Sequence, residues 1–148
     1  MTDPLSRLMP GVPPAAGWLG LAGLLPFFAG AAAHWVMPGD LVRTVTIGYG
    51  LAILSFMGGC RWGFAAAGMG QGPRAGALIL SVIPCLFGWL VVLMPGSLPY
   101  FGLALGFVTL FFADRELSKD GGAPPWWPAL RLPLSVGAAG ALVAAGVA

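Results

Sequence analysis

The chain has 148 residues, of which 58% are hydrophobic and 8% are charged, and its formal net charge is +2. An ordinary soluble domain carries about 25% charged residues, so this composition excludes a water-soluble fold. The small net charge and the lack of any basic run also argue against a nucleic-acid-binding protein.

Five long apolar segments occupy most of the chain. A membrane-spanning helix needs about 20 mainly apolar residues, and lipid offers no partner to backbone groups outside a helix. The sequence therefore predicts an all-α integral membrane protein with one domain (residues 1–148) and a bundle of five transmembrane helices. We expect these helices at 15–38, 44–66, 75–95, 97–113 and 131–148.

The first segment, 15–38, contains Pro26, which predicts a kink because proline breaks the backbone hydrogen-bond pattern of a helix. Arg7 and the small residues at 31–33 also resemble a cleavable signal peptide. However, the apolar run starts well after Arg7 and is longer than a signal peptide. We therefore expect this segment to be retained as the first spanning helix.

The second segment, 44–66, carries the most unusual chemistry of the chain. Gly59 and Gly63 have the GxxxG spacing that favours close packing of membrane helices. Arg61 lies between them, inside the apolar pattern, where a charged side chain is costly and needs a partner.

Three interpretations of Arg61 are open. Its guanidinium could reach lipid headgroups at the interface. It could instead form an ion pair with Asp114 or Glu116, which follow the fourth segment on the same side of the membrane, and Asp114 has the better geometry because it lies at the end of that segment. It could also hold an anionic ligand in a pocket with Tyr49 and Trp62.

The last two segments differ in character. The fourth, 97–113, is short and again has GxxxG spacing, at Gly102 and Gly106, so we expect these glycines to pack against a neighbouring helix. The fifth, 131–148, is rich in alanine and glycine and only weakly apolar. We expect other helices to surround it.

Basic residues predict the orientation. Five crossings place Arg43 alone on one side and every other Lys and Arg on the side of the N-terminus: Arg7, Arg61, Arg74, Arg115, Lys119 and Arg131. The positive-inside rule then predicts a cytoplasmic N-terminus and a periplasmic C-terminus. Aromatic and basic residues near the predicted helix ends are expected to anchor the bundle at the membrane interfaces: Trp18, Trp35, Trp126, Trp127 and Arg131.

Motifs for catalysis, metal binding or cofactor binding are missing from the sequence. It has no P-loop, no H-E-x-x-H and no C-x-x-C. His34 is the one histidine and cannot form a metal or haem site by itself. We therefore expect a protein that is not an enzyme and needs no cofactor or metal.

Three stretches resemble a known family: W-L-G-L-A-G-L-L-P-F at 18–27, Y-G-L-A-I-L-S-F-M-G-G-C-R-W-G at 49–63 and P-P-W-W-P-A-L-R-L-P-L at 124–134. They resemble the bacterial domain-of-unknown-function family 3429, which has mitochondrial relatives in eukaryotes. The resemblance implies a small multipass membrane protein without an established activity. It also implies that Gly58, Gly59, Arg61, Trp62, Arg131 and Pro133 belong to family motifs.

Two functions follow as expectations. The first is a non-enzymatic accessory or assembly subunit of a larger complex in an energy-transducing membrane, here the bacterial inner membrane. The alternative is a protein that binds or transports a lipid, a quinone or a porphyrin through a pocket near Arg61. In both cases the lipid bilayer is the immediate partner.

Overall fold

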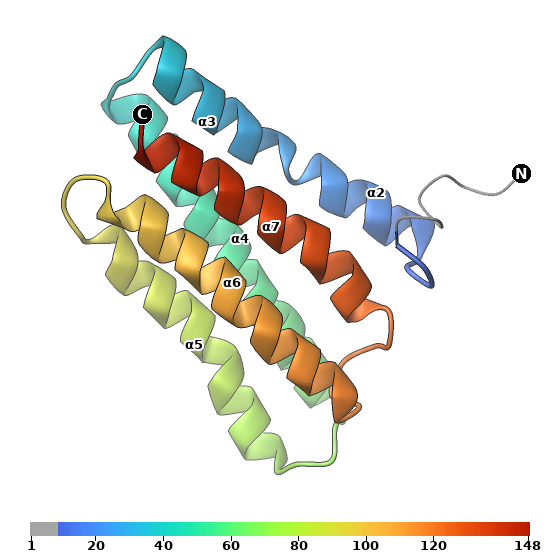
Figure 1. The fold of residues 1–148 in the computed structure, drawn as a ribbon. Coiled ribbons are helices and arrows are strands. Elements are labelled where there is room, and N and C mark those ends of the chain that lie inside the picture. The colour runs from blue at the N-terminus through green and yellow to red at the C-terminus, as the bar shows by residue number, and fades with distance from the viewer. Residues whose placement is uncertain (1–8) are drawn as a thin grey trace, which may run out of the picture.

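A computed structural model describes residues 9–148, which fold as an all-helical bundle (Figure 1). Five segments of this part of the chain are long and apolar enough to cross a membrane, which confirms the predicted all-α membrane architecture. Its helices are α2 (Pro14–Ala22), α3 (Leu25–Val36), α4 (Asp40–Ala66), α5 (Arg74–Val92), α6 (Leu98–Lys119) and α7 (Trp127–Gly146). Helices α2 and α3 together make the first spanning segment, Pro14–Val36.

The break between α2 and α3 lies at Gly23 and Leu24, just before Pro26. Proline has no backbone N–H, and its ring clashes with the carbonyl four residues earlier, which favours a break at this turn. Helices α5 and α7 nevertheless continue through Pro84 and Pro133. The hydroxyl of Tyr49 on α4 donates a hydrogen bond to the Gly23 carbonyl over 2.8 Å. A side chain of another helix thus satisfies a backbone group at the kink.

Two helix boundaries differ from the prediction in a way that matters for the site. Helix α6 continues to Lys119 instead of ending at 113, and α7 begins at Trp127 instead of 131. The residues after 113 are polar but form helices readily, and Pro128 is tolerated in the first turn of α7. Apolar character marks the part of a helix inside the lipid, whereas the helix itself extends further.

Helix packing divides the bundle into closely associated pairs. Helix α4 packs mainly on α5, α6 packs mainly on α7, and α3 contacts both α4 and α7. The centre is filled by large buried side chains, among them Phe27, Leu54, Leu103, Phe107 and Leu142. In contrast to α3, α2 packs on α7 and lies apart from α4 (Figure 1).

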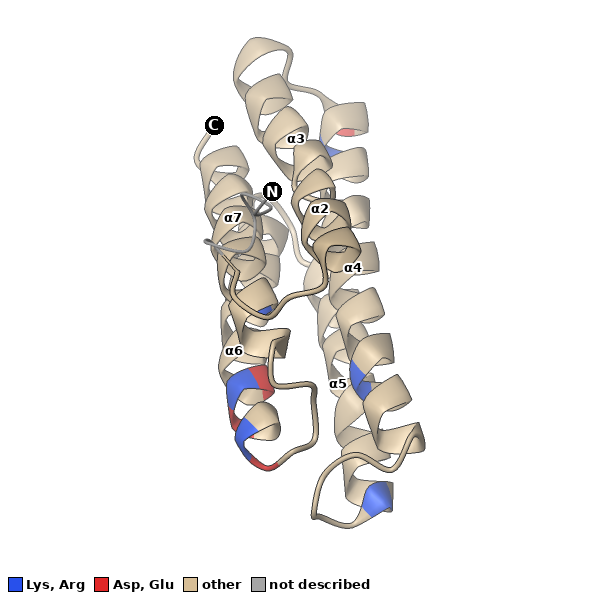
Figure 2. Cartoon of the chain, turned by 90° about the vertical axis from the view of Figure 1, so that its right-hand side faces the viewer, with Lys and Arg blue, Asp and Glu red and all other residues tan. Residues whose placement is uncertain are grey.

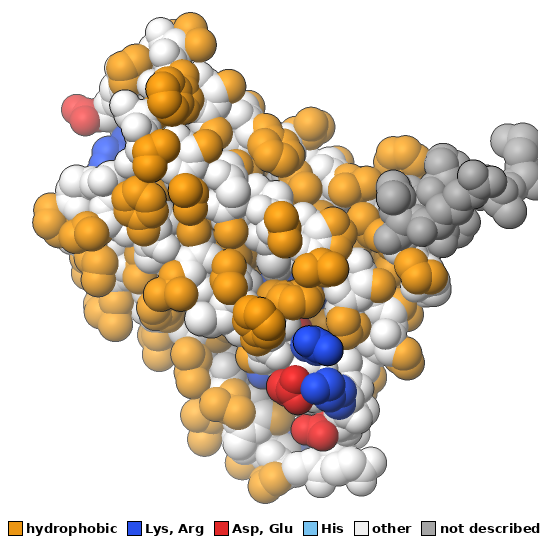
Figure 3. Space-filling view, in the orientation of Figure 1, with side chains coloured by type: hydrophobic (Ala, Val, Ile, Leu, Met, Phe, Trp, Pro, Cys, Tyr) orange, Lys and Arg blue, Asp and Glu red, His pale blue; other side chains and the backbone are white. Residues whose placement is uncertain are grey.

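The outer surface is suited to lipid. Large apolar side chains are exposed on every helix, and Figure 3 shows hydrophobic side chains spread over the whole visible face of the bundle. Charged residues gather mainly at the end of the bundle where α6 ends and α5 begins, with a smaller group at the start of α4 (Figure 2). Of the basic residues used to predict the orientation, Arg7 lies outside the described residues.

The glycines that allow close packing are only partly those predicted. A methyl group on Gly102 would collide with Val91, and one on Gly106 with Phe87 and Leu54. On α4, however, a Cβ at Gly59 or Gly63 would meet no atom within 4 Å. These two glycines face away from the bundle, so the structure corrects the prediction that they pack within the chain.

The packing glycine of this part of α4 is Gly58, one residue earlier. A Cβ built there would lie 2.6 Å from the carbonyl oxygen of Ser81, beside Pro84 on α5. The GxxxG spacing therefore identified the right region of α4, but the glycine that packs on α5 is Gly58.

Candidate functional site

Three charged residues meet in the interior of the bundle. Arg61 on α4 donates from Nη1 to Oδ1 of Asp114 on α6 over 2.6 Å, and Arg131 on α7 donates from Nε to Oδ2 over 2.9 Å. The side chain of Asp114 is completely buried, that of Arg131 is 2% exposed and that of Arg61 is 11% exposed. We call these three residues the Arg–Asp–Arg cluster.

The helix boundaries explain how the cluster forms. Helices α4 and α6 end, and α7 begins, at the same end of the bundle. Each charged residue lies four or five residues inside its helix, which is about 6–8 Å of axial rise. All three side chains are therefore at a similar depth, and the two carboxylate oxygens each take one arginine.

The cluster has an excess of positive charge, because two guanidinium groups share one carboxylate. Burying a charge is expensive unless it is paired and hydrogen-bonded. Asp114 offsets this cost for one of the two cations. The cluster as a whole keeps one unit of positive charge. Water hardly reaches Asp114 and Arg131, whereas Arg61 also lines a polar hollow at this end of the bundle, beside Arg74 and Asp120.

Unused hydrogen-bonding groups lie on the Arg131 side of the cluster. Among the described residues, the buried side-chain atoms without a hydrogen-bond partner are Nη2 of Arg131, Nε1 of Trp127 and Oγ of Ser135. Arg131 and Ser135 are four residues apart on α7, and therefore neighbours on one helix face. A buried donor without a partner costs about 1–3 kcal/mol, and more when the group is charged.

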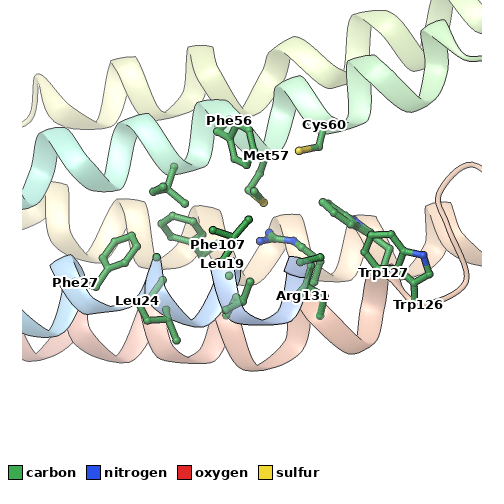
Figure 4. A pocket seen from close by; sticks show the side chains of 17 residues that line it. Leu19, Leu24, Phe27, Phe56, Met57, Cys60, Phe107, Trp126, Trp127 and Arg131 are labelled. Carbon is green, nitrogen blue, oxygen red and sulfur yellow. The ribbon is translucent and has the colours of Figure 1, made fainter. Parts of the chain in front are cut away.

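Arg131 also lines an apolar cavity of about 310 Å³. Figure 4 shows its guanidinium reaching toward Met57 and Phe107 inside this cavity. Arg131 is the one charged residue among the lining residues, which otherwise are apolar or glycine apart from Cys60. Exposed side chains of Leu19 on α2 and Phe56 on α4 also line it, so the cavity opens between these helices toward the lipid-facing surface.

The kink in the first span creates this opening. Helix α3 packs on both α4 and α7, but beyond the break at Gly23 helix α2 follows α7 and lies apart from α4. The space between α2 and α4 is the cavity that contains Arg131 and Cys60. The sequence feature behind the cavity is thus Pro26, through the helix break that precedes it.

The predicted site residues are only partly brought together. Of the two carboxylates proposed for Arg61, Asp114 binds it, whereas Glu116 is 65% exposed and pairs with Lys119 over 2.7 Å. Arg61 is therefore held inside the bundle, and its guanidinium is engaged with a carboxylate.

The predicted pocket of Arg61, Tyr49 and Trp62 does not exist as one site in the described chain. Tyr49 is twelve residues from Arg61 on the same helix, about 18 Å along its axis, and bonds to Gly23. Trp62 is 49% exposed and faces outward. Arg131, which we expected to anchor the bundle at the interface, is buried in the cluster instead.

The predicted tryptophan anchors also divide into two groups. Trp18 and Trp35 have exposed side chains, as an interfacial anchor requires. Trp127 is buried against Phe64, and Trp126 is half-buried beside Trp127, so both line the cavity and neither is an exposed anchor. The sequence did not predict the roles of Arg131, Trp127, Ser135 and Cys60, although Arg131 lies in a family motif.

Arg131 places a charged hydrogen-bond donor at the wall of an apolar space. Such a space suits an apolar molecule with one hydrogen-bond acceptor beside the guanidinium. The described residues contain no group of three or more His, Cys, Asp or Glu side chains that could hold a metal ion.

Comparisons with known proteins agree with this membrane architecture. The family model described as protein of unknown function (DUF3429) matches residues 12–147, which confirms the resemblance seen in the sequence. The chain is also 32% identical over 141 residues to Transmembrane protein 69 of Xenopus tropicalis, covering 93% of this chain and 55% of that protein. It thus spans about half the length of this relative. No solved structure matches the chain.

Proposed function

Because the chain belongs to the DUF3429 family of proteins of unknown function, we propose its role from the site itself: a non-enzymatic membrane protein that binds an amphiphilic small molecule in the cavity beside Arg131. The observation that carries this proposal is the buried side chain of Arg131, which lines an apolar cavity and belongs to a cluster with one excess positive charge. A bound acceptor would offset the cost of burying this guanidinium beside an apolar space.

The shape of the cavity supports an amphiphile over a polar solute. Apart from Arg131, its walls are formed by side chains such as Leu24, Phe27, Met57 and Phe107. Ligand pockets of about 300–1,000 Å³ with apolar walls and a few placed polar groups are typical of small-molecule sites. We therefore propose a binding site beside Arg131, whereas the sequence suggested one beside Arg61.

The route of entry follows from the opening between α2 and α4. Leu19 and Phe56 at this opening are exposed on the lipid-facing surface, so a molecule dissolved in the membrane could enter sideways without crossing water. We place the protein in the bacterial inner membrane, with its N-terminus in the cytoplasm and its C-terminus in the periplasm. The distribution of basic residues supports this orientation.

The two cysteines provide a direct test of occupancy. Cys60 lines the cavity, whereas Cys85 is exposed on α5 outside it. Protein purified in mild detergent would be treated with the membrane-permeant reagent methyl methanethiosulfonate before and after delipidation. We expect delipidation to accelerate modification of Cys60 several-fold and to leave Cys85 unchanged. Equal acceleration of both cysteines, or of neither, would contradict a ligand in the cavity.

A second candidate is an accessory or assembly subunit of an energy-transducing membrane complex. It is favoured by the outward face of α4, where Gly59 and Gly63 meet no atom of the chain and Trp62 is half exposed. A helix of another protein could approach closely there. Native-level tagged protein would then migrate with a large complex in mild detergent, and Gly59→Leu would release it. Migration as a small free species would count against this role.

A further inference from the structure

We infer that the molecule bound beside Arg131 carries one negative charge, and that it is a long-chain fatty acid held through its carboxylate. This inference rests on the proposed binding function and adds the chemical class of the ligand. It follows from the charge of the Arg–Asp–Arg cluster, from the hydrogen-bond donors on the cavity wall, and from the apolar character of the cavity.

The charge of the cluster favours an anion. Arg61 and Arg131 contribute two positive charges and Asp114 one negative charge, and Asp114 has already used one oxygen for each arginine. One further negative charge would balance the cluster. A neutral acceptor such as a quinone carbonyl could accept a hydrogen bond from Arg131 but would leave the excess charge buried.

The polar side chains of the cavity wall favour a group that only accepts hydrogen bonds. Arg131 and Trp127 line the cavity, and their side-chain N–H groups can only donate. An ionised carboxylate has two acceptor oxygens and no donor. An alcohol or an amide would bring donors of its own, for which Arg131 and Trp127 provide no acceptor.

The cavity wall favours a carboxylate over a phosphodiester, although both carry a single negative charge. A fatty acid continues from its carboxylate as one apolar chain, which matches walls made of Leu24, Phe27 and Met57. A phospholipid phosphate has substituents on both sides, one of which is polar. The lining offers no charged residue besides Arg131 to receive that polar part.

Binding measurements with related probe molecules test whether the bound molecule carries a negative charge. Delipidated protein in a nonionic detergent would be titrated with radiolabelled oleic acid at neutral pH, with unlabelled oleic acid, methyl oleate, decylubiquinone or phosphatidylglycerol as competitors. We expect oleic acid to compete at least tenfold more strongly than each of the others. This comparison needs no variant, because methyl oleate differs from oleic acid mainly in lacking the charge.

The outcomes of these measurements distinguish a wrong ligand class from a wrong proposed function. If methyl oleate or decylubiquinone competes as strongly as oleic acid, the ligand does not need a negative charge and the inference is wrong. The proposed binding function would still hold. Stronger competition by phosphatidylglycerol would overturn the fatty acid in favour of a phospholipid. If no probe binds and Cys60 modification is insensitive to delipidation, the inference and the proposed function both fail.

A pair of variants at Ser135 tests whether the carboxylate of the ligand lies beside Arg131. Ser135→Asp places a carboxylate of the protein one helical turn from Arg131, where it would balance the cluster, and Ser135→Asn is a neutral control of similar size. We expect Ser135→Asp to weaken oleic acid binding at least tenfold relative to Ser135→Asn. Equal binding by the two variants, with melting temperatures showing that both are folded, would overturn the assignment of the head to Arg131.

Discussion

Arg131 and Asp114 are joined by a 2.9 Å hydrogen bond between Nε and Oδ2, although they lie on different helices with a polar loop between them. This bond fixes the guanidinium so that Nε faces α6, while the side chain of Arg131 also lines the cavity. Since Asp114 also binds Arg61, one carboxylate links α4, α6 and α7.

Asp114 is the residue on which the cluster depends. Asp114→Asn would leave two buried cations without a counter-charge, and breaking a buried ion pair in this way costs about 3–5 kcal/mol. We expect the free energy of unfolding, measured by denaturant titration in detergent, to fall by about this amount. Glu116→Gln is the matched control, because Glu116 is exposed and pairs only with Lys119; it should leave stability unchanged.

The charge balance of the cluster gives a second prediction. Arg131→Gln removes the excess charge and leaves Arg61 paired with Asp114, so it should destabilise less than Asp114→Asn. For the same reason, the double variant Asp114→Asn/Arg131→Gln should be more stable than Asp114→Asn alone, by at least about 1 kcal/mol. If the double variant loses as much unfolding free energy as the two single variants together, the side chains of Asp114 and Arg131 do not interact.

Neighbouring glycines on α4 give a third prediction. Gly58→Ala would place a methyl group 2.6 Å from the Ser81 carbonyl oxygen, which belongs to the backbone and cannot move aside easily. We expect a loss of about 1–3 kcal/mol, as for other overpacked sites. Gly59→Ala meets nothing in the chain and should be neutral or slightly stabilising, because alanine favours a helix. Thermal unfolding in detergent measures the stability of the two variants. Equal losses of stability would contradict the close packing of α4 on α5 at Gly58.

The kink depends on Tyr49 in a way that can be measured. Tyr49→Phe removes the hydroxyl that donates to the partly buried Gly23 carbonyl, and a carbonyl that loses its donor away from water costs about 1–3 kcal/mol. We expect the loss in the free energy of unfolding to lie in this range. A change below about 0.5 kcal/mol would mean that the Gly23 carbonyl finds another partner in the variant.

The orientation is tested by reporters at the two ends of the chain. A cytoplasmically active fluorescent protein should be bright when fused to the N-terminus, and a periplasmically active phosphatase should work when fused to the C-terminus. Signals that place both termini in one compartment would contradict five crossings. Signals on the opposite sides would reverse the orientation inferred from Arg61, Arg74, Arg115 and Lys119.

Much of the fold could be predicted because lipid restricts the choices. Long apolar runs must be helices, so five runs gave five spanning segments. The helix ends were harder, because the residues after Ala113 are polar yet continue α6 to Lys119. Hydropathy reports where a helix leaves the lipid, which differs from where the helix ends.

The site was predictable only in part. An arginine inside an apolar segment requires a partner, and this pointed to Asp114 for Arg61. Nothing equivalent identified Arg131, because a basic residue at the edge of an apolar run reads as an interfacial anchor. Its burial follows from α7 starting four residues earlier, at Trp127. The faces of Gly58 and Gly59 also could not be distinguished, since spacing along a helix does not specify which neighbour it meets.

Native mass spectrometry of the protein released from membranes tests the central claim most directly, with the wild type compared with Cys60→Phe. The added ring would project into the cavity that Cys60 and Arg131 both line, and would occupy the space of the ligand. We predict that the wild type retains one bound amphiphile, and that Cys60→Phe is folded and free of it. Wild-type protein without a bound molecule, or an equally loaded Cys60→Phe variant, would contradict a ligand in the cavity beside Arg131.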